Sequence, residues 1–171
     1  MSLSEKNNSQ DNRNKVLVES FIEEIFNKHN LSAIEKYLGP DTGNRNGGFK
    51  QFLSTFFNAF SDMHTTIEHI IAEKNLVVVF LNGSGTHLGE FKGIHPTNKS
   101  VNIRSADLYR IENNIIVEHW EIVDQLNLLQ QTGTTLWFTM MCNGFICKHK
   151  QYAYEWPHLT RAEFHNVPTN Q

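Results

Sequence analysis

Cysteine is scarce in this sequence, with Cys142 and Cys147 the two examples in 171 residues. Two thiols make no disulfide framework, and a Cys-x4-Cys pair is not a common zinc spacing. We therefore expect both cysteines to be reduced, half-buried thiols.

Signals for several ligand classes are also missing. The formal net charge is −3, so the chain lacks the basic surface that nucleic acid binding requires. Neither a G-x-G-x-x-G nor a P-loop pattern is present, which disfavours dinucleotides and ATP, and no Ser or Cys lies in a nucleophile motif. Nine histidines are spread without metal-ligand spacing such as H-E-x-x-H. We therefore expect no metal and no cofactor.

No segment is apolar enough to cross a membrane. The longest uncharged run, Gln125 to Cys147, is interrupted by polar residues, whereas a span needs ~20 predominantly apolar residues. Residues 1–11 are polar and lack the apolar core of a signal peptide. We expect these residues to be a disordered leader and the protein to be cytoplasmic.

Apolar residues make up 39 % of the chain, including twelve Phe, which is enough to build the core of one domain. From about Asn12, apolar residues recur at four-residue spacing, as in Leu17, Phe21 and Ile25, and predict a helix. A short second helix is predicted from Leu31 to Leu38, because Gly39-Pro40 stops it. The Phe-rich stripe from Phe49 to Phe60 predicts a third helix.

The rest of the domain alternates with a period of two and predicts strands. They cover Thr65–Ile71, Leu76–His87, Val101–Ile111 and Ile115–Asp124, with an Asn113-Asn114 hairpin between the last two. Helices followed by consecutive strands predict an α+β fold, a strongly curved antiparallel sheet closed by N-terminal helices. Such a cone can leave a cavity at its wide end.

Four segments carry a resemblance to a known family. They are Thr86-His87-Leu88-Gly89-Glu90-Phe91-Lys92-Gly93-Ile94 with Pro96-Thr97-Asn98-Lys99, Ile116-Val117-Glu118-His119-Trp120-Glu121, Asp124 to Gly133, and Asn58-Ala59-Phe60-Ser61-Asp62. Their order and spacing resemble the SnoaL-like polyketide cyclases, also called ester cyclases, over residues 13–133. We therefore divide the chain into the leader, a domain at 12–133 and an extension at 134–171.

The resemblance implies the nuclear-transport-factor-2-like cone. It also implies an intramolecular aldol closure of a polyketide ring without metal or cofactor, and a homodimer or higher homo-oligomer paired through the open face of the sheet. The acid–base residue of the family is the Asp of H-W-D, and Glu121 occupies that position. Three departures stand out: Glu replaces this Asp, the segment after Leu38 lacks the family's His-Asn-like pair, and residues 134–171 have no counterpart.

Aldol closure needs a base to remove a proton next to a carbonyl and an acid to protonate the new alkoxide, and one carboxyl group can do both. If Glu121 faces the cavity, alternation places His119 beside it, unless a bulge intervenes. His87 and Arg104 could stabilise enolate charge. Candidates to contact the substrate, a small apolar carbonyl compound, are Arg104, Phe21, Ile25, Phe57, Phe91, Ile94 and Asp124.

Each of these residues also has a structural interpretation. Glu121 could be a solvated strand residue, His119 and His87 could be structural histidines, and Arg104 could pair with an acid on the sheet. Asp124 could cap a following helical turn. Three other functions stay open: a non-catalytic module that binds a small molecule, an assembly domain whose apolar run Leu136–Met141 fills the cone, and a hydratase or epoxide hydrolase, which would need more polar groups around a water.

Overall fold

The computed structural model describes residues 3–39 and 43–133, with side chains from residues 8 and 48 onward in these two ranges. The chain divides into two compact units, Met1–Leu136 and Trp137–Gln171. The second unit lies outside the described residues. So do the predictions about the C-terminal extension, its apolar run and both cysteines.

The first helix, α1, spans Leu3–Ile22 and continues as a π-helical turn, η1, over Glu23–Asn27. It begins inside the segment predicted to be a disordered leader, so most of that segment is helical. This part has no apolar stripe, but polar side chains one turn apart support it: Arg13 donates to Ser9 Oγ at 2.7 Å and to Gln10 Oε1 at 2.6 Å.

Two further helical segments follow before the sheet. A 3₁₀ turn, η2, at Leu31–Ala33 leads into α2 at Ile34–Tyr37, and α3 spans Gly43–Ala59. Leu38 ends α2 in an extended conformation and forms a bridge to Ile116 in the sheet. The helices predicted from periodicity are therefore present.

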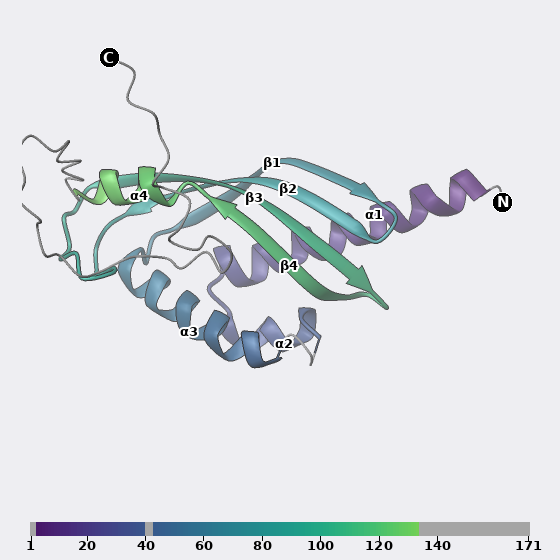
Figure 1. Cartoon of the computed structure of the whole chain (residues 1–171), viewed down its shortest axis with the longest axis horizontal. Coiled ribbons are helices and arrows are strands. Elements are labelled where there is room, and N and C mark those ends of the chain that lie inside the picture. Colours follow the sequence, from purple (N-terminus) through teal and green to yellow (C-terminus); the bar gives the residue numbers. More distant parts are fainter. Residues whose placement is uncertain (1–2, 40–42, 134–171) are drawn as a thin grey trace, which may run out of the picture. The chain divides into compact units, whose positions relative to one another are not determined.

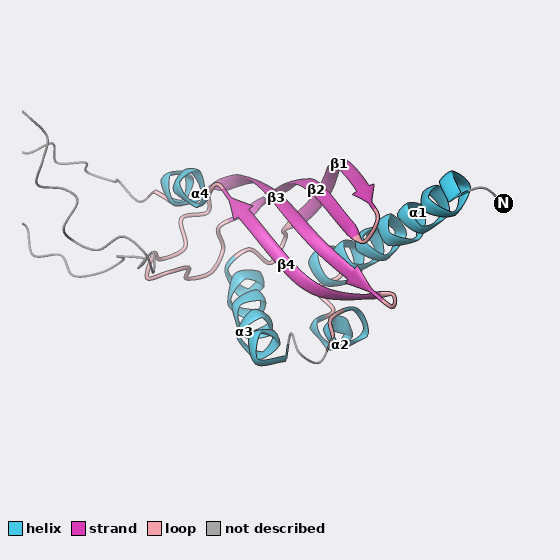
Figure 2. Cartoon of the chain, turned by 45° about the vertical axis from the view of Figure 1, so that its right-hand side comes forward, coloured by secondary structure: helices cyan, strands magenta, loops and turns pink. Residues whose placement is uncertain are grey.

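The sheet has four antiparallel strands in sequential order (Figures 1 and 2): β1 His64–Glu73, β2 Leu76–Thr86, β3 Ser100–Glu112 and β4 Ile115–Val123. The predicted Asn hairpin joins β3 to β4, with positive φ at Asn113 (51°) and Asn114 (63°). Two consecutive positive φ angles are the signature of the tight turn that suits sheet twist. A short helix, α4, follows at Gln125–Thr132.

The β3–β4 ladder contains a register shift. Ile111 pairs with Ile116, but Arg110, the residue before Ile111 in β3, pairs with Glu118 and not with Val117. Val117 is therefore an additional residue in β4, as in a β-bulge. Beyond it the pairing is regular, and Tyr109, Asp107 and Ser105 lie opposite His119, Glu121 and Val123.

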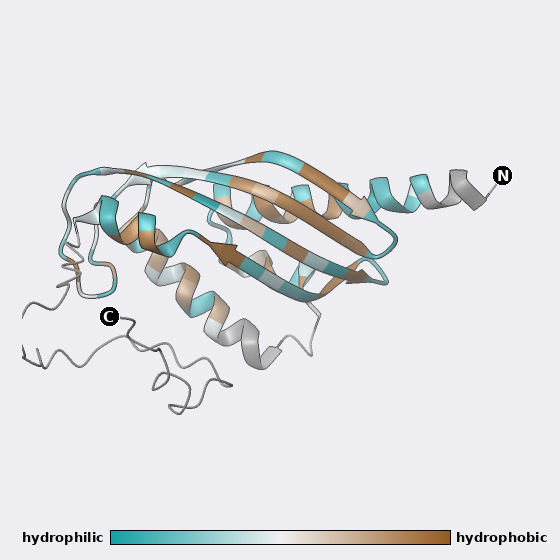
Figure 3. Ribbon diagram, turned by 45° about the horizontal axis from the view of Figure 1, so that its top comes forward, coloured by the Kyte–Doolittle hydropathy of each residue, from teal (hydrophilic) through white to brown (hydrophobic). Residues whose placement is uncertain are grey.

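One face of the sheet packs against the helices and forms the main core. Its buried members include Val18, Phe21 and Ile25 from α1 and η1, Leu53 from α3, and Val77, Val79 and Tyr109 from the sheet. Hydrophobic and hydrophilic residues alternate along the strands in Figure 3, as a sheet with one buried face requires. The predicted α+β fold is confirmed. Among the described residues, no helix is both long and apolar enough to span a membrane.

Candidate active site

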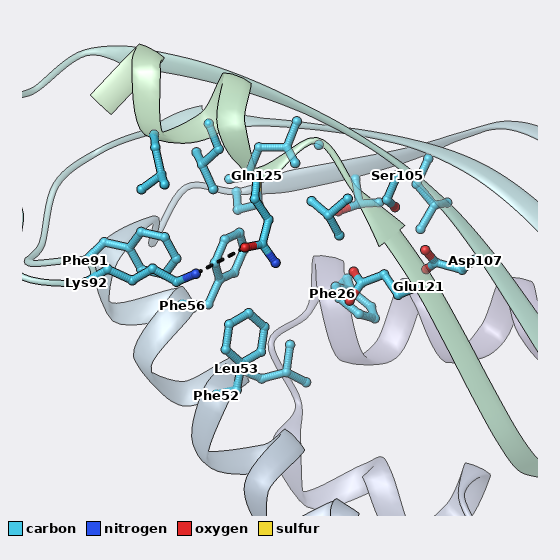
Figure 4. Close-up of a pocket in the computed structure, with 18 residues that line it drawn as sticks. Phe26, Phe52, Leu53, Phe56, Phe91, Lys92, Ser105, Asp107, Glu121 and Gln125 are labelled. Carbon is cyan, nitrogen blue, oxygen red and sulfur yellow. Dashed lines mark hydrogen bonds between the residues drawn. The ribbon is translucent and has the colours of Figure 1, made fainter. Parts of the chain in front are cut away.

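A cavity of about 110 Å³ lies between the inner face of the sheet and the helices (Figure 4). Its wall is mainly apolar, with Phe26 from η1, Phe52, Leu53 and Phe56 from α3, and Leu128 and Leu129 from α4. Polar groups come chiefly from Ser105, Asp107, Glu121, Gln125 and Lys92. An apolar wall with a few polar groups is typical of small-molecule sites, but their usual volume is ~300–1,000 Å³. A larger ligand would have to extend through the mouth.

Two carboxyl groups face the same end of this cavity. Asp107 on β3 and Glu121 on β4 are direct cross-strand partners and both contribute to the wall. Figure 4 shows both side chains at the same end of the cavity. They differ in solvent contact, because Asp107 is 2 % exposed while Glu121 is exposed to solvent.

Asp107 is held by its neighbours on one side. The Tyr109 hydroxyl donates to Asp107 Oδ2 at 3.0 Å, and His119 Nε2 lies 3.7 Å from the same oxygen. The Tyr109 and His119 rings stack with centroids 4.6 Å apart. Asp107 Oδ1 and His119 Nε2 are buried and have no hydrogen-bond partner among the described residues. The inner end of the site therefore contains unsatisfied polar atoms, which are rare in protein interiors.

These surroundings shift two proton equilibria. Burial raises the pKa of the Glu121 carboxyl, and the negative charge of Asp107 raises it further, while His119 opposes the shift. Solvent on the open side of Glu121 limits the size of this rise. Burial, followed by the charge of Asp107, holds the pKa of Tyr109 well above its usual value, so its hydroxyl stays protonated.

Lys92 and Gln125 lie at the other end of the cavity. Lys92 Nζ donates to Gln125 Oε1 at 3.4 Å and lies 5.7 Å from the centre of the Phe91 ring. The cavity thus has an acidic inner end and a cation beside its aromatic wall, as Figure 4 shows.

The structure brings three of the predicted site residues together at or beside the cavity. Glu121 and Phe91 line it, and His119 lies next to Asp107 on the same sheet face. His87 does not line it. That ring is fully buried against Phe60, at 5.3 Å between centroids, with Nδ1 3.1 Å from Thr97 Oγ1. Burial lowers the pKa of His87, and a hydrogen bond from its ring to the Gly89 backbone opposes this shift.

The other predicted residues lie elsewhere. Arg104 is on the outer face of the sheet, where its guanidinium makes two hydrogen bonds to Glu68, at 2.9 and 3.1 Å. Asp124 is the N-cap of α4, and its Oδ1 accepts from the Asn127 amide at 3.0 Å. Phe21, Ile25 and Phe57 are in the main core, and Ile94 bridges Phe91 without lining the cavity.

Sequence reasoning missed Asp107 and most of the apolar wall. Asp107 is an acid in a strand that otherwise supplies Tyr109 and Ile111 to the core. A charged residue at an inward position of a strand is a signal that could have found it. Phe52 and Phe56 belong to the stripe that predicts the third helix, and both line the cavity.

The comparisons with known proteins can be set against this geometry. A family model described as SnoaL-like polyketide cyclase matches residues 16–132. The chain belongs to the SnoaL-like polyketide cyclase family. The match ends at the end of α4 and includes both carboxyl groups and the whole cavity wall.

Solved structures with the same fold include three of particular interest. AclR from Streptomyces galilaeus, provisionally described as a hydroxylase, is 25 % identical, with 72 % of this chain and 82 % of AclR covered and a TM-score of 0.65. A protein from Acidithiobacillus ferrooxidans, provisionally described as a polyketide cyclase, is 24 % identical, with coverage of 77 % and 97 % and a TM-score of 0.63. IdmH from Streptomyces antibioticus, also provisionally a polyketide cyclase, is 26 % identical, with coverage of 66 % and 93 % and a TM-score of 0.58. No curated protein matches the chain.

Proposed function

We propose that this protein is an acid–base catalyst that closes a ring by intramolecular aldol addition in a small apolar carbonyl compound. The observation that carries the proposal is the Glu121 carboxyl, whose pKa is raised at the inner end of an apolar cavity. Proton transfer is most effective when the pKa of the catalytic group approaches the working pH. Membership of a family of polyketide cyclases supports the same reaction class.

The proposed reaction needs a group that takes a proton from carbon and returns one to oxygen. Glu121 is suited to both steps because its carboxyl reaches the cavity and stays in contact with solvent. His119, beside Asp107, is positioned to influence the charge at this end. The aromatic wall, with Phe26, Phe52 and Phe56, suits a flat apolar substrate. Neither step calls for a metal or cofactor. Among the described residues, no group of three His, Cys, Asp or Glu could hold a metal.

The test is turnover of a panel of aromatic polyketides that carry a ketone or aldehyde within reach of an activated methylene. Ring closure by aldol addition leaves the mass unchanged, so the product is an isomer with a new retention time and absorption spectrum. We expect Glu121→Gln to lower kcat by ~10²–10⁴, the usual contribution of a positioned acid–base group. A matched control, Glu68→Gln, removes a carboxylate from the outer face of the sheet. Turnover by Glu121→Gln at the wild-type rate would refute the proposal.

A non-catalytic binding module is the second candidate. The cavity volume of about 110 Å³ favours it, because it leaves little room for a polycyclic substrate without movement of the wall. This candidate predicts that Glu121→Gln binds an aromatic polyketide from the panel as tightly as the wild type does, and that neither protein converts it.

We also propose that the outer face of the sheet pairs with a second copy of the chain. Two rows cross this face: Ile71, Val78, Leu108 and Trp120, and then His69, Phe80, Ala106 and Ile122. Large apolar side chains in these rows are strongly exposed, with Ile122 at 78 % and Trp120 at 51 %. A hollow of about 450 Å³ adjoins Phe80 and Ile122. Exposed apolar surface of this kind marks interaction sites.

The charged pairs that flank these rows favour a copy of the same chain. Arg104–Glu68 lies on one side and Arg110–Glu118 on the other. A two-fold axis would place the arginines of one copy opposite the glutamates of the other. We expect a dimer by light scattering and a monomer for Ile122→Glu. A wild-type monomer at high protein concentration would refute pairing. The cytoplasmic location and the lack of nucleic-acid binding stay predictions of the sequence.

A further inference from the structure

Asp107 is an acid that the proposed reaction does not yet use. It lies in the middle of β3, is 2 % exposed and is the direct cross-strand partner of Glu121. Side chains of direct partners start from Cβ atoms ~5 Å apart, so the two carboxyl groups are within reach of each other. Figure 4 places both at the same end of the cavity.

The two oxygens of Asp107 have different surroundings. Oδ2 accepts from Tyr109 at 3.0 Å and faces His119 Nε2 at 3.7 Å. Oδ1 is buried and has no hydrogen-bond partner among the described residues. A buried, unsatisfied carboxylate oxygen is costly, so this atom needs a donor.

Among the groups around this end of the cavity, the Glu121 carboxyl can supply that donor when it is protonated. From η1 and α3 the wall is apolar, with Phe26, Leu53 and Phe56. The titratable groups facing Glu121 from the sheet are Asp107, Tyr109 and His119. Tyr109 already donates its proton to Oδ2. Lys92 lies at the other end of the cavity and donates to Gln125.

We propose that the protonated Glu121 carboxyl donates to Asp107 Oδ1, so that the two carboxyl groups work as one acid–base pair. Two carboxylates at one site do not both ionise readily, because each disfavours the charge of the other. The hydrogen bond from Tyr109 favours the charge on Asp107. Among the described residues, Glu121 accepts no hydrogen bond that would favour its ionised form.

The pair gives each proton of the proposed aldol reaction a defined donor and acceptor; this part rests on the proposed function. In the first step, a substrate C–H bond breaks and its proton goes to a Glu121 oxygen, while the original proton of Glu121 moves to Asp107 Oδ1. The pair now holds two protons and the substrate is an enolate. After the carbon–carbon bond forms, Glu121 protonates the alkoxide and takes its own proton back from Asp107.

The pair also gives a role to Glu121 in place of the Asp of the family motif. Its additional methylene lets the carboxyl at position 121 extend toward Asp107 while its second oxygen remains in the cavity. An aspartate at position 121 would have a shorter reach across the same strand pair.

The experiment follows the Glu121 side-chain carboxyl carbon by ¹³C NMR as a function of pH, with no substrate present. In the wild type we expect its midpoint above the ordinary value of ~4.3. Asp107→Asn should lower the midpoint by about one pH unit, within the ~1–3 units that a nearby charge commonly produces. The control Glu68→Gln should leave it unchanged.

An unchanged Glu121 midpoint in a folded Asp107→Asn variant would overturn the proposal. So would a wild-type midpoint at the ordinary value. If Asp107→Asn does not fold, Glu121→Asp replaces it. The midpoint of the carboxyl at position 121 should then lie less far above the ordinary value for Asp than that of Glu121 lies above its own, and an equally large rise would contradict the pair. Since no substrate is present, a missing turnover bears only on the proposed function.

Discussion

The hydroxyl of Tyr109 gives the most direct test of the buried end of the site. Tyr109 and Asp107 are 0 % and 2 % exposed, and the 3.0 Å hydrogen bond between them is the one that Asp107 Oδ2 accepts. Hydrogen bonds to charged groups contribute ~1.5–3 kcal/mol to stability when buried. Tyr109→Phe keeps the ring that stacks on His119 and removes only this bond, so we expect a loss of about 2 kcal/mol.

That loss has a measurable size in thermal unfolding. For roughly 130 described residues, an unfolding entropy of ~2.1 cal/mol/K per residue makes 1 kcal/mol equal to about 4 °C. Tyr109→Phe should therefore lower Tm by about 7 °C, measured by circular dichroism or calorimetry at neutral pH. The loss should also appear as a lower urea midpoint with an unchanged m-value.

A matched control separates burial from the hydrogen bond itself. Tyr37 is 3 % exposed, and its hydroxyl donates to Glu24 Oε2 at 2.6 Å. The Glu24 side chain is 26 % exposed and also accepts from Lys36 at 3.0 Å. Water can replace the lost donor there, so Tyr37→Phe should cost below about 1 kcal/mol. If Tyr109→Phe cost no more than Tyr37→Phe, the reasoning about the buried carboxylate would be refuted.

Three further predictions concern proton equilibria and backbone contacts. The raised pKa of Glu121 means that the folded protein binds this proton more tightly than the unfolded chain, so stability falls as pH rises through that pKa. Glu121→Gln should therefore be more stable than the wild type at pH 7 and no more stable below about pH 4, as pH-dependent urea titrations would show. The lowered pKa of His87 has the opposite sign: its contribution is complete above ~6.5 and is lost as pH falls through the folded-state pKa, so His87→Gln should flatten stability over that range. A Cβ at Gly89 would meet Asn58 O at 2.3 Å, whereas one at Gly48 meets nothing within 4 Å; Gly89→Ala should cost about 1–3 kcal/mol and Gly48→Ala, in the interior of α3, should stabilise by ~0.5–1 kcal/mol, and equal effects would contradict the contact.

Much of the fold follows from local patterns. The four-residue spacing from Leu17 to Phe26 and the Asn113-Asn114 turn were sufficient to place the helix and the hairpin, because side-chain periodicity and φ preference are local properties. The polar first half of α1 was missed for the same reason. Its support comes from side-chain hydrogen bonds such as that of Arg13 with Ser9, which leave no apolar period to detect.

The pairing of Asp107 with Glu121 depends on a property that is not local. Counting back from the hairpin, where Glu112 pairs with Ile115, places Asp107 opposite Trp120. The additional residue at Val117 moves the register by one, and Asp107 then lies opposite Glu121. Alternation along β4 correctly placed His119 with Glu121, but no pattern in the strand itself marks the bulge. The contact of Arg104 on β3 with Glu68 on β1 also depends on the pairing of strands that are distant in the sequence.

The additional residue at Val117 determines which side chains face the cavity and which face the outer apolar surface of the sheet. In a ladder without it, Trp120 would turn inward against Asp107, and Glu121 would turn outward among the exposed apolar side chains. A register shift of one residue would thus replace the Glu121 carboxyl in the cavity with the Trp120 indole, and would put the charge of Glu121 in the middle of the outer apolar face. Insertions or deletions between Val117 and Glu121 should therefore be purged in descendants of this sequence, whereas the hairpin on the other side of the bulge can vary in length without disturbing either surface.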